Sequence, residues 1–248
     1  MIKFFRNIRK TNLKEGKAIN YLKYAIGEIV LVVIGILIAL GINNWNENRK
    51  QHLNDIEFLK NLKNEIILDT INVSSKIKSY ERIDRNIETT LALIDSSKVL
   101  TAEQTKFISN TLAQAEWLTP TYKDLDRNGL MIASGAIKRI DQNLHNSYLK
   151  YLEAFKFSYD TGNKLANSLE RTINNELYPS VDLNFTDATR NRVEFDLADL
   201  KDNRTFNNAL QISIYYREAV INMHKPLLEE GKSLILQIED KLKQQQGQ

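Results

Sequence analysis

An apolar segment near the N-terminus constrains the fold of this chain more than any other feature. Residues 25–42 have the sequence AIGEIVLVVIGILIALGI, which is apolar throughout except for Glu28. As an α-helix, this segment would be roughly 27 Å long, close to the thickness of a bilayer's hydrocarbon core. Glu28 lies one turn from its start, where a carboxylate can reach the headgroups or stay protonated. Tyr24 and Trp45 bracket the segment as interfacial aromatic residues do. The sequence therefore predicts one transmembrane helix, at residues 25–45.

The charges on either side of this segment predict its orientation. Against a lone Glu15, the preceding residues include Lys3, Arg6, Arg9, Lys10, Lys14, Lys17 and the interfacial Lys23. After the segment, two basic residues are balanced by two acidic ones. Cytoplasmic flanks carry the excess of lysine and arginine. We therefore expect a single-pass membrane protein with a cytoplasmic N-terminus and a C-terminal domain on the far side of the membrane.

A cleaved signal peptide is the main alternative for this segment, because Ala39-Leu40-Gly41 resembles a processing site. Three features argue against it. The basic leader and the apolar stretch are both long for a signal peptide, and no polar region precedes the cleavage site.

The basic leader itself, MIKFFRNIRK, has two interpretations. It interleaves isoleucine and phenylalanine with cations, a pattern suited to lying on an anionic inner leaflet. It can equally serve only as a topology signal. The sequence leaves both interpretations open.

Glu28, Gly35 and Ala39 fall along one stripe of the predicted transmembrane helix. Small residues four apart let two membrane helices approach closely, and an intramembrane carboxylate beside them suggests pairing with another helix. That helix would belong to a second copy or to an unidentified membrane protein. The alternative is a snorkelling Glu28 beside incidental small residues.

The composition narrows the remaining classes of function. The chain has 248 residues, of which 42% are apolar and 26% charged, as in ordinary globular domains. With 34 basic and 31 acidic residues, the formal charge of +3 gives no reason to expect a nucleic-acid partner. The absence of cysteine excludes disulfides and thiolate chemistry.

The rest of the chain has the apolar periodicity of helices, and we expect an all-α fold. The predicted division is a basic leader at 1–24, the membrane helix at 25–45, an extracytoplasmic helical bundle at 46–243 and a polar tail at 244–248. No glycine or proline interrupts residues 42–97, so the membrane helix is expected to continue outward as one long helix, with a periodicity that suits a bundle or coiled coil.

The later helices are predicted from capping and breaking residues. Thr101 and Gln104 resemble a capping box that opens a shorter helix. Residues 137–177 have the period of one long helix, stopped by Pro179. Pro120 and Gly129 mark an irregular link, and residues 181–200 are expected to form loops with short turns. Asp202 is the predicted N-cap of a last helix, in which Pro226 is expected to introduce a kink.

No constellation of residues points to catalysis, a metal or a cofactor. The three histidines, His52, His145 and His224, lie far apart in the sequence and are expected to be ordinary surface or bundle residues. The sequence DLDRNG from Asp124 copies the start of an EF-hand loop, but the twelfth position is Gly135 instead of the required glutamate, so we expect a turn. Tyr148, Tyr151, Phe155 and Tyr159 form an aromatic stripe whose spacing suits a bundle core or, alternatively, a ligand pocket.

The run YAIGEIVLVVIGILIALGINNWNE at residues 24–47, together with the leader, resembles the N-terminal signature of a family of Bacteroidota membrane proteins, the domain of unknown function 6090. The charged leader, the Ala-Ile-Gly-Glu entry, the apolar span and the Asn-Asn-Trp-Asn-Glu exit occur in the family's order. Residues 122–129 and 202–210 resemble it more loosely. The resemblance implies that Glu28 belongs to the span and that the membrane is a Gram-negative inner membrane, but it implies no activity or cofactor.

Three functions remain after these exclusions. The leading hypothesis is a non-catalytic, membrane-anchored helical module that binds protein or envelope partners in the periplasm, either as a homodimer or with another membrane protein. The second is a ligand-sensing periplasmic bundle, which would have to signal through a partner's membrane helix because about 24 cytoplasmic residues are too few for an output domain. An enzyme would need carboxylates assembled from different helices.

Overall fold

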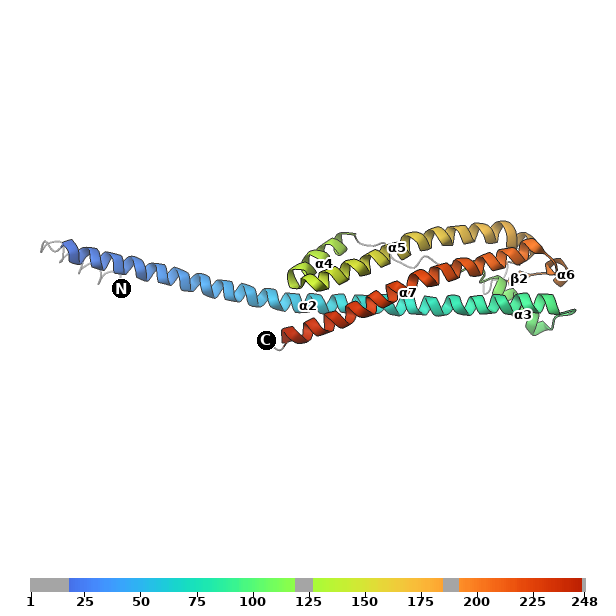
Figure 1. Cartoon of the computed structure of the whole chain (residues 1–248), viewed down its shortest axis with the longest axis horizontal. Coiled ribbons are helices and arrows are strands. Elements are labelled where there is room, and N and C mark those ends of the chain that lie inside the picture. Colours follow the sequence, from blue (N-terminus) through green and yellow to red (C-terminus); the bar gives the residue numbers. More distant parts are fainter. Residues whose placement is uncertain (1–17, 119–126, 185–191, 247–248) are drawn as a thin grey trace. The chain divides into compact units, whose positions relative to one another are not determined.

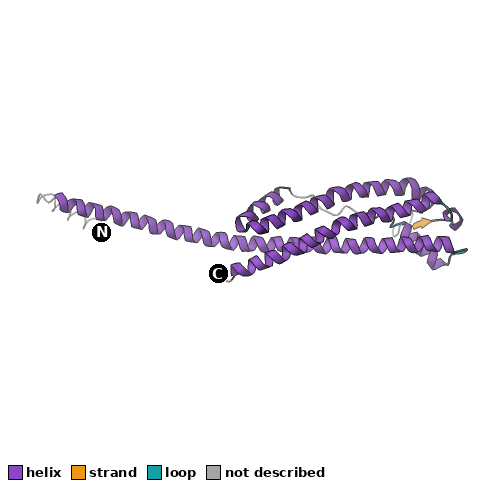
Figure 2. Cartoon of the chain, viewed as in Figure 1, coloured by secondary structure: helices purple, strands orange, loops and turns teal. Residues whose placement is uncertain are grey.

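Helices make up almost all of the structure, which confirms the predicted all-α class (Figure 2). The structure is a computed structural model of the whole chain, and it describes residues 18–118, 127–184 and 192–246. Within these ranges, two strands of three residues each are the only sheet. The chain divides into two compact units, Met1–Glu57 and Phe58–Gln248. The finer predicted division, with boundaries at residues 24, 45 and 243, stays a prediction.

The long first helix is present as predicted. Helix α2 runs Ala18–Ser96 and contributes residues to both units (Figure 1). Its last turn is closed by the Ser97 N–H, which donates to the Leu93 carbonyl at 3.1 Å. Helix α3 (Ala102–Leu112) follows a short connection and begins with the predicted capping box. The Gln104 N–H donates to Thr101 Oγ1 at 3.2 Å, and the Thr101 N–H donates to Gln104 Oε1 at 2.9 Å.

The prediction of one continuous helix at 137–177 is wrong, because the helix is interrupted at Asp141. Helix α4 (Arg127–Ile140) ends there, and helix α5 (Gln142–Thr172) begins. Asp141 has extended backbone angles, and its carboxylate accepts hydrogen bonds from the N–H groups of Asn143 and Leu144 at 2.9 and 3.0 Å, so it is an N-cap. Gly129 therefore lies in the first turn of α4 and not in an irregular link, whereas Pro120 lies outside the described residues.

The segment predicted as loop contains short regular elements. Helix α5 continues into a π-helical turn, η1 (Ile173–Leu177), and a 3₁₀ turn, η2 (Tyr178–Ser180), which contains Pro179. Strands β1 (Asp182–Asn184) and β2 (Arg192–Glu194) then pair antiparallel, with Leu183 opposite Val193. Helix α6 (Leu197–Leu200) follows. A three-residue strand is too short to produce a detectable alternation of apolar and polar residues.

The last helix, α7 (Arg204–Gln246), starts later than predicted. Asn203 caps it, because its side-chain oxygen accepts the Phe206 N–H at 3.0 Å. The predicted cap, Asp202, instead has a φ of 61° and makes the turn before the helix. Pro226 lies inside α7, which continues on both sides of it.

Helices α2, α5 and α7 form an antiparallel bundle in the second unit, as predicted. Side chains of α2 residues 63, 70 and 84 face α7 residues 239, 231 and 217, so the two helices run in opposite directions in one register. The Ser158 hydroxyl of α5 donates to the Met223 carbonyl of α7 at 3.1 Å. Leucine and isoleucine fill the core with side chains that are at most 3% exposed: Leu59, Ile66, Ile83, Ile87, Leu144, Leu169, Leu210, Leu234 and Ile238.

Gly231 of α7 lies close to side chains of both α2 and α5. A Cβ atom added there would lie 2.7 Å from Thr70 Cγ2 of α2 and 3.4 Å from a ring carbon of Tyr151 in α5. Thr70 cannot rotate away without loss, because its hydroxyl donates to the Ile67 carbonyl at 2.8 Å. Gly162, in the middle of α5, has no atom within 4 Å of such a Cβ. The glycine at 231 is therefore required by packing, and the glycine at 162 is not.

We predict opposite effects for two glycine-to-alanine substitutions. Gly231→Ala should lower the free energy of unfolding by about 1–3 kcal/mol through overpacking. Gly162→Ala should raise it by about 0.5–1 kcal/mol, because alanine favours a helix. Urea unfolding of the detergent-solubilised chain, followed by circular dichroism, measures both. Adding Thr70→Ser, which removes the clashing methyl group and keeps the hydroxyl, should restore the Gly231→Ala variant. A stable Gly231→Ala variant without this rescue would contradict the proposed close approach.

Candidate functional site

The apolar stretch of α2 in the first unit is exposed. An 18-residue window of this helix has a mean hydropathy of 2.8, and none of it is buried. The large apolar side chains from Ile29 to Ile42 have exposed fractions between 47% for Val33 and 67% for Leu31. A core helix of a soluble domain would be mostly buried in its own chain, whereas a membrane helix or a signal sequence would not. A continuous apolar surface of this length is not stable in water and requires a cover.

Glu28, Gly35 and Ala39 do lie on one face of α2. At 100° per residue, steps of seven and eleven residues return to within about 20° of the starting direction. All three residues are exposed, and a Cβ added at Gly35 would meet no atom within 4 Å. The face is therefore accessible to another helix. Its role in helix association stays a prediction.

The predicted interfacial residues Lys23, Tyr24 and Trp45 are exposed as well. The guanidinium carbon of Arg49 lies 5.9 Å from the centre of the Trp45 ring, a cation–π contact that the sequence interpretation missed. The spacing of four residues on a helix could have indicated it. The topology-determining residues of the leader, Lys3 to Lys17, lie outside the described residues.

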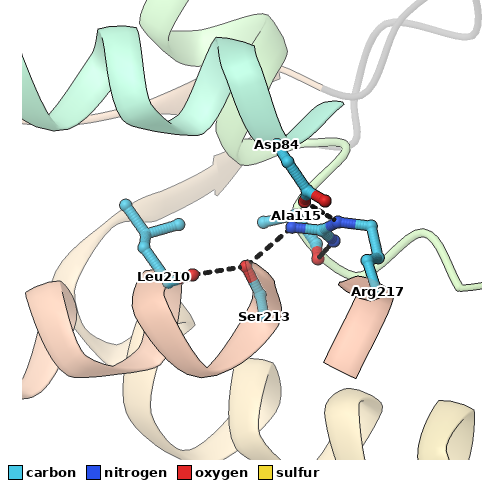
Figure 3. Close-up of polar contacts among 5 residues, drawn as sticks. All are labelled: Asp84, Ala115, Leu210, Ser213 and Arg217. Carbon is cyan, nitrogen blue, oxygen red and sulfur yellow. Dashed lines mark hydrogen bonds and ion pairs between the residues drawn. The ribbon is translucent and has the colours of Figure 1, made fainter. Parts of the chain in front are cut away.

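A buried charge cluster in the second unit was also missed (Figure 3). Arg217 of α7 has no exposed surface, and its Nε donates to Asp84 Oδ1 of α2 at 2.5 Å. Its two terminal nitrogens donate to the Ala115 carbonyl at 2.7 Å and to the Ser213 hydroxyl at 2.8 Å. Ser213 in turn donates to the Leu210 carbonyl at 2.7 Å. The cluster joins α2, α7 and the turn after α3, and each polar group in it has a partner.

Burial and the ion pair shift the pKa values of Asp84 and Arg217 in opposite directions. Burial raises the pKa of the Asp84 carboxyl, and the Arg217 guanidinium opposes this shift. Burial lowers the pKa of Arg217, and Asp84 opposes it. Because each charge depends on the other, loss of one partner leaves an uncompensated charge in the core.

His224 lies seven residues further along α7, also without exposed surface. Burial, with a smaller contribution from the positive charge of Lys76, lowers its pKa to about 4. The imidazole is therefore neutral at pH 7. His52 and His145 are half-buried. The three histidines thus lie at the surface or in the bundle, as expected. The sequence did not distinguish His224, which is fully buried, from the other two.

The aromatic stripe of α5 belongs to the core. Tyr148, Tyr151 and Phe155 are at most 7% exposed, and Tyr159 is half-buried. Burial raises the pKa of Tyr148 to about 12. The Tyr151 hydroxyl donates to Asp69 Oδ2 of α2 at 2.9 Å. The stripe therefore packs helices together, as the spacing for a bundle core predicted.

Metal-binding side chains do not gather in the part of the chain that the structure describes, where no group of three histidine, aspartate or glutamate residues could hold an ion. The calcium-loop sequence falls partly outside that part, since Asp124 and Asp126 are not described. Its remaining residues, from Arg127 to Gly129, lie in the first turn of α4.

The fold and these contacts define a class: an all-α protein in which one described helix is long and apolar enough to cross a membrane. Within that class, the chain belongs to the Family of unknown function (DUF6090), whose model matches residues 28–152. The match confirms the resemblance carried by the N-terminal signature. It covers α2 from Glu28 onward, α3, α4 and the first part of α5. No curated protein and no solved structure matches the chain.

We predict that Asp84→Asn lowers the free energy of unfolding by about 3–5 kcal/mol, because the buried guanidinium of Arg217 loses its counter-charge. The double variant Asp84→Leu/Arg217→Met should lose less of this free energy, since it removes both buried charges. Urea unfolding followed by circular dichroism measures both. The control is Glu229→Ala, which breaks the exposed ion pair with Lys232 and should change stability by less than about 0.5 kcal/mol. Equal losses in the three variants would refute a special role of the buried pair.

His224 predicts a pH dependence of stability. The unfolded chain takes up a proton on this imidazole near pH 6.5, and the folded chain only near pH 4. Stability is therefore lost as the pH falls through this window, by up to about 3 kcal/mol. In His224→Gln this contribution should be absent. Urea unfolding of both proteins at pH 7 and pH 4.5 tests the prediction, and an identical pH dependence would contradict it.

Proposed function

We propose that this protein is a non-catalytic helical module, anchored in a Gram-negative inner membrane by α2, whose bundle binds protein or envelope partners in the periplasm. The observation that carries the proposal is the apolar stretch of α2, which has a mean hydropathy of 2.8 and is not buried. Lipid hydrocarbon can cover such a surface, because an apolar α-helix pairs its own backbone polar groups and exposes only apolar side chains.

The orientation in the proposal rests on the leader and on the residues that border the stretch. The excess of lysine and arginine before the apolar stretch supports a cytoplasmic N-terminus. Trp45 and Arg49, in contact on the outer side, suit the headgroup region, where an aromatic ring and a cation both find polar surroundings.

The non-catalytic character rests on what the buried polar groups do. Asp84 and Arg217 satisfy each other inside the bundle, and Asp69 accepts the hydrogen bond of Tyr151. These groups join helices, as polar groups do in structural cores. We infer that binding, and not chemistry, is the task of the bundle.

The helix face of Glu28, Gly35 and Ala39 supports an assembly role for the span, since close helix approach needs small side chains. We predict that zero-length crosslinking in intact membranes captures a homodimer or one defined membrane partner of the wild-type chain. Gly35→Leu and Glu28→Leu should reduce the captured product several-fold. Mass spectrometry of the carbonate-resistant membrane fraction measures it.

The matched control is Gly41→Leu, the same change on a different face of α2, where a Cβ likewise meets no atom within 4 Å. This variant should crosslink as the wild type does. Recovery of the chain in the soluble fraction would sink the anchor proposal. If wild type and variants give the same mixture of unrelated crosslinked products, the span has no assembly role and only anchors the chain.

A further inference from the structure

Residues of α3 and β2, with residues next to these elements, line a cavity of about 540 Å³. The two elements are neighbours in the second unit (Figure 1). The volume of the cavity is within the range of sites for small organic ligands. Leu100, Val193 and Phe195 supply apolar lining, and the side chain of Val193 is only 3% exposed. The apolar side chains would suit the hydrocarbon part of a ligand.

The α3 wall of the cavity is polar. Lys106, Ser109 and Asn110 line it and lie three and four residues apart, so they share one face of the helix. An ammonium, a hydroxyl and an amide together provide donors for a carboxylate. In the described ranges, no carboxylate lies within ion-pair distance of Lys106.

The β2 wall carries the opposite charge. Glu194 lines the cavity from the strand, across from α3, and is exposed. A carboxylate has several acceptor positions, so it can receive a ligand ammonium in addition to contacts that it already makes. The cavity thus presents a cation, an anion and an apolar surface to one occupant.

We propose that this cavity binds a zwitterion with an apolar side chain, which is the chemistry of an apolar α-amino acid. Its carboxylate would face Lys106, Ser109 and Asn110, and its ammonium would face Glu194. Its side chain would contact Leu100 and Phe195. A short peptide with both termini free carries the same groups and is the other source of this chemistry. The site lies wholly in the second unit and is independent of the membrane anchor.

The test is isothermal titration calorimetry of the full chain in lipid nanodiscs with three probes of the same side chain. L-phenylalanine carries both charges, N-acetyl-L-phenylalanine only the carboxylate, and L-phenylalaninamide only the ammonium. We expect L-phenylalanine to bind at least tenfold more tightly than either single-charge probe, since each charge-assisted hydrogen bond contributes about that factor. Diphenylalanine is the fourth probe, and tighter binding of this peptide would identify a peptide as the occupant.

Lys106→Gln and Glu194→Gln should each weaken L-phenylalanine binding about tenfold or more. The control is Lys78→Gln, which removes an exposed lysine of α2 that does not line the cavity. It should bind as the wild type does. The proposal is overturned if the three single-residue probes bind equally, if Lys106→Gln binds normally, or if neither L-phenylalanine nor diphenylalanine binds.

Discussion

The buried ion pair between Asp84 and Arg217 is the contact on which the arrangement of the bundle depends. Apolar side chains on α2 and α7 would pack in several registers, because leucine and isoleucine recur every three or four residues along both helices. A buried charge admits only the register in which it meets its partner. Arg217 also donates to the Ala115 carbonyl, so the same residue fixes the turn that follows α3. This contact therefore links α7 to the segment that follows α3.

Arg217, His224 and Gly231 lie seven residues apart on α7, and each meets α2 in a different way. Arg217 meets a carboxylate, His224 lies near the positive charge of Lys76, and Gly231 admits the methyl group of Thr70. Displacement of α7 by one heptad would bring the wrong residue to all three positions. The charge of Arg217, the neutral imidazole of His224 and the small size of Gly231 thus together specify one register of α7 against α2. Leucine and isoleucine alone could not specify it.

The sequence predicted the parts of this protein that local patterns determine. The long first helix, the capping box at Thr101 and the exposed apolar stretch each follow from neighbouring residues. The break at Asp141 was missed because the apolar period continues across it, and the cap was visible only as one aspartate among many. The pairing of Asp84 with Arg217 joins residues that are 133 positions apart, and no local pattern reports such a contact. The cavity beside β2 depends on a three-residue strand that carries no periodic signal.

The separation between Asp84 and Arg217 also affects how the protein is made. Helix α7 is synthesised after α2 and α5. Until then, the core faces of α2 and α5 that pack against α7 expose apolar side chains. Contacts this distant in sequence form slowly, because a long loop must close before they stabilise anything. The nascent chain therefore needs protection from aggregation until α7 has been synthesised.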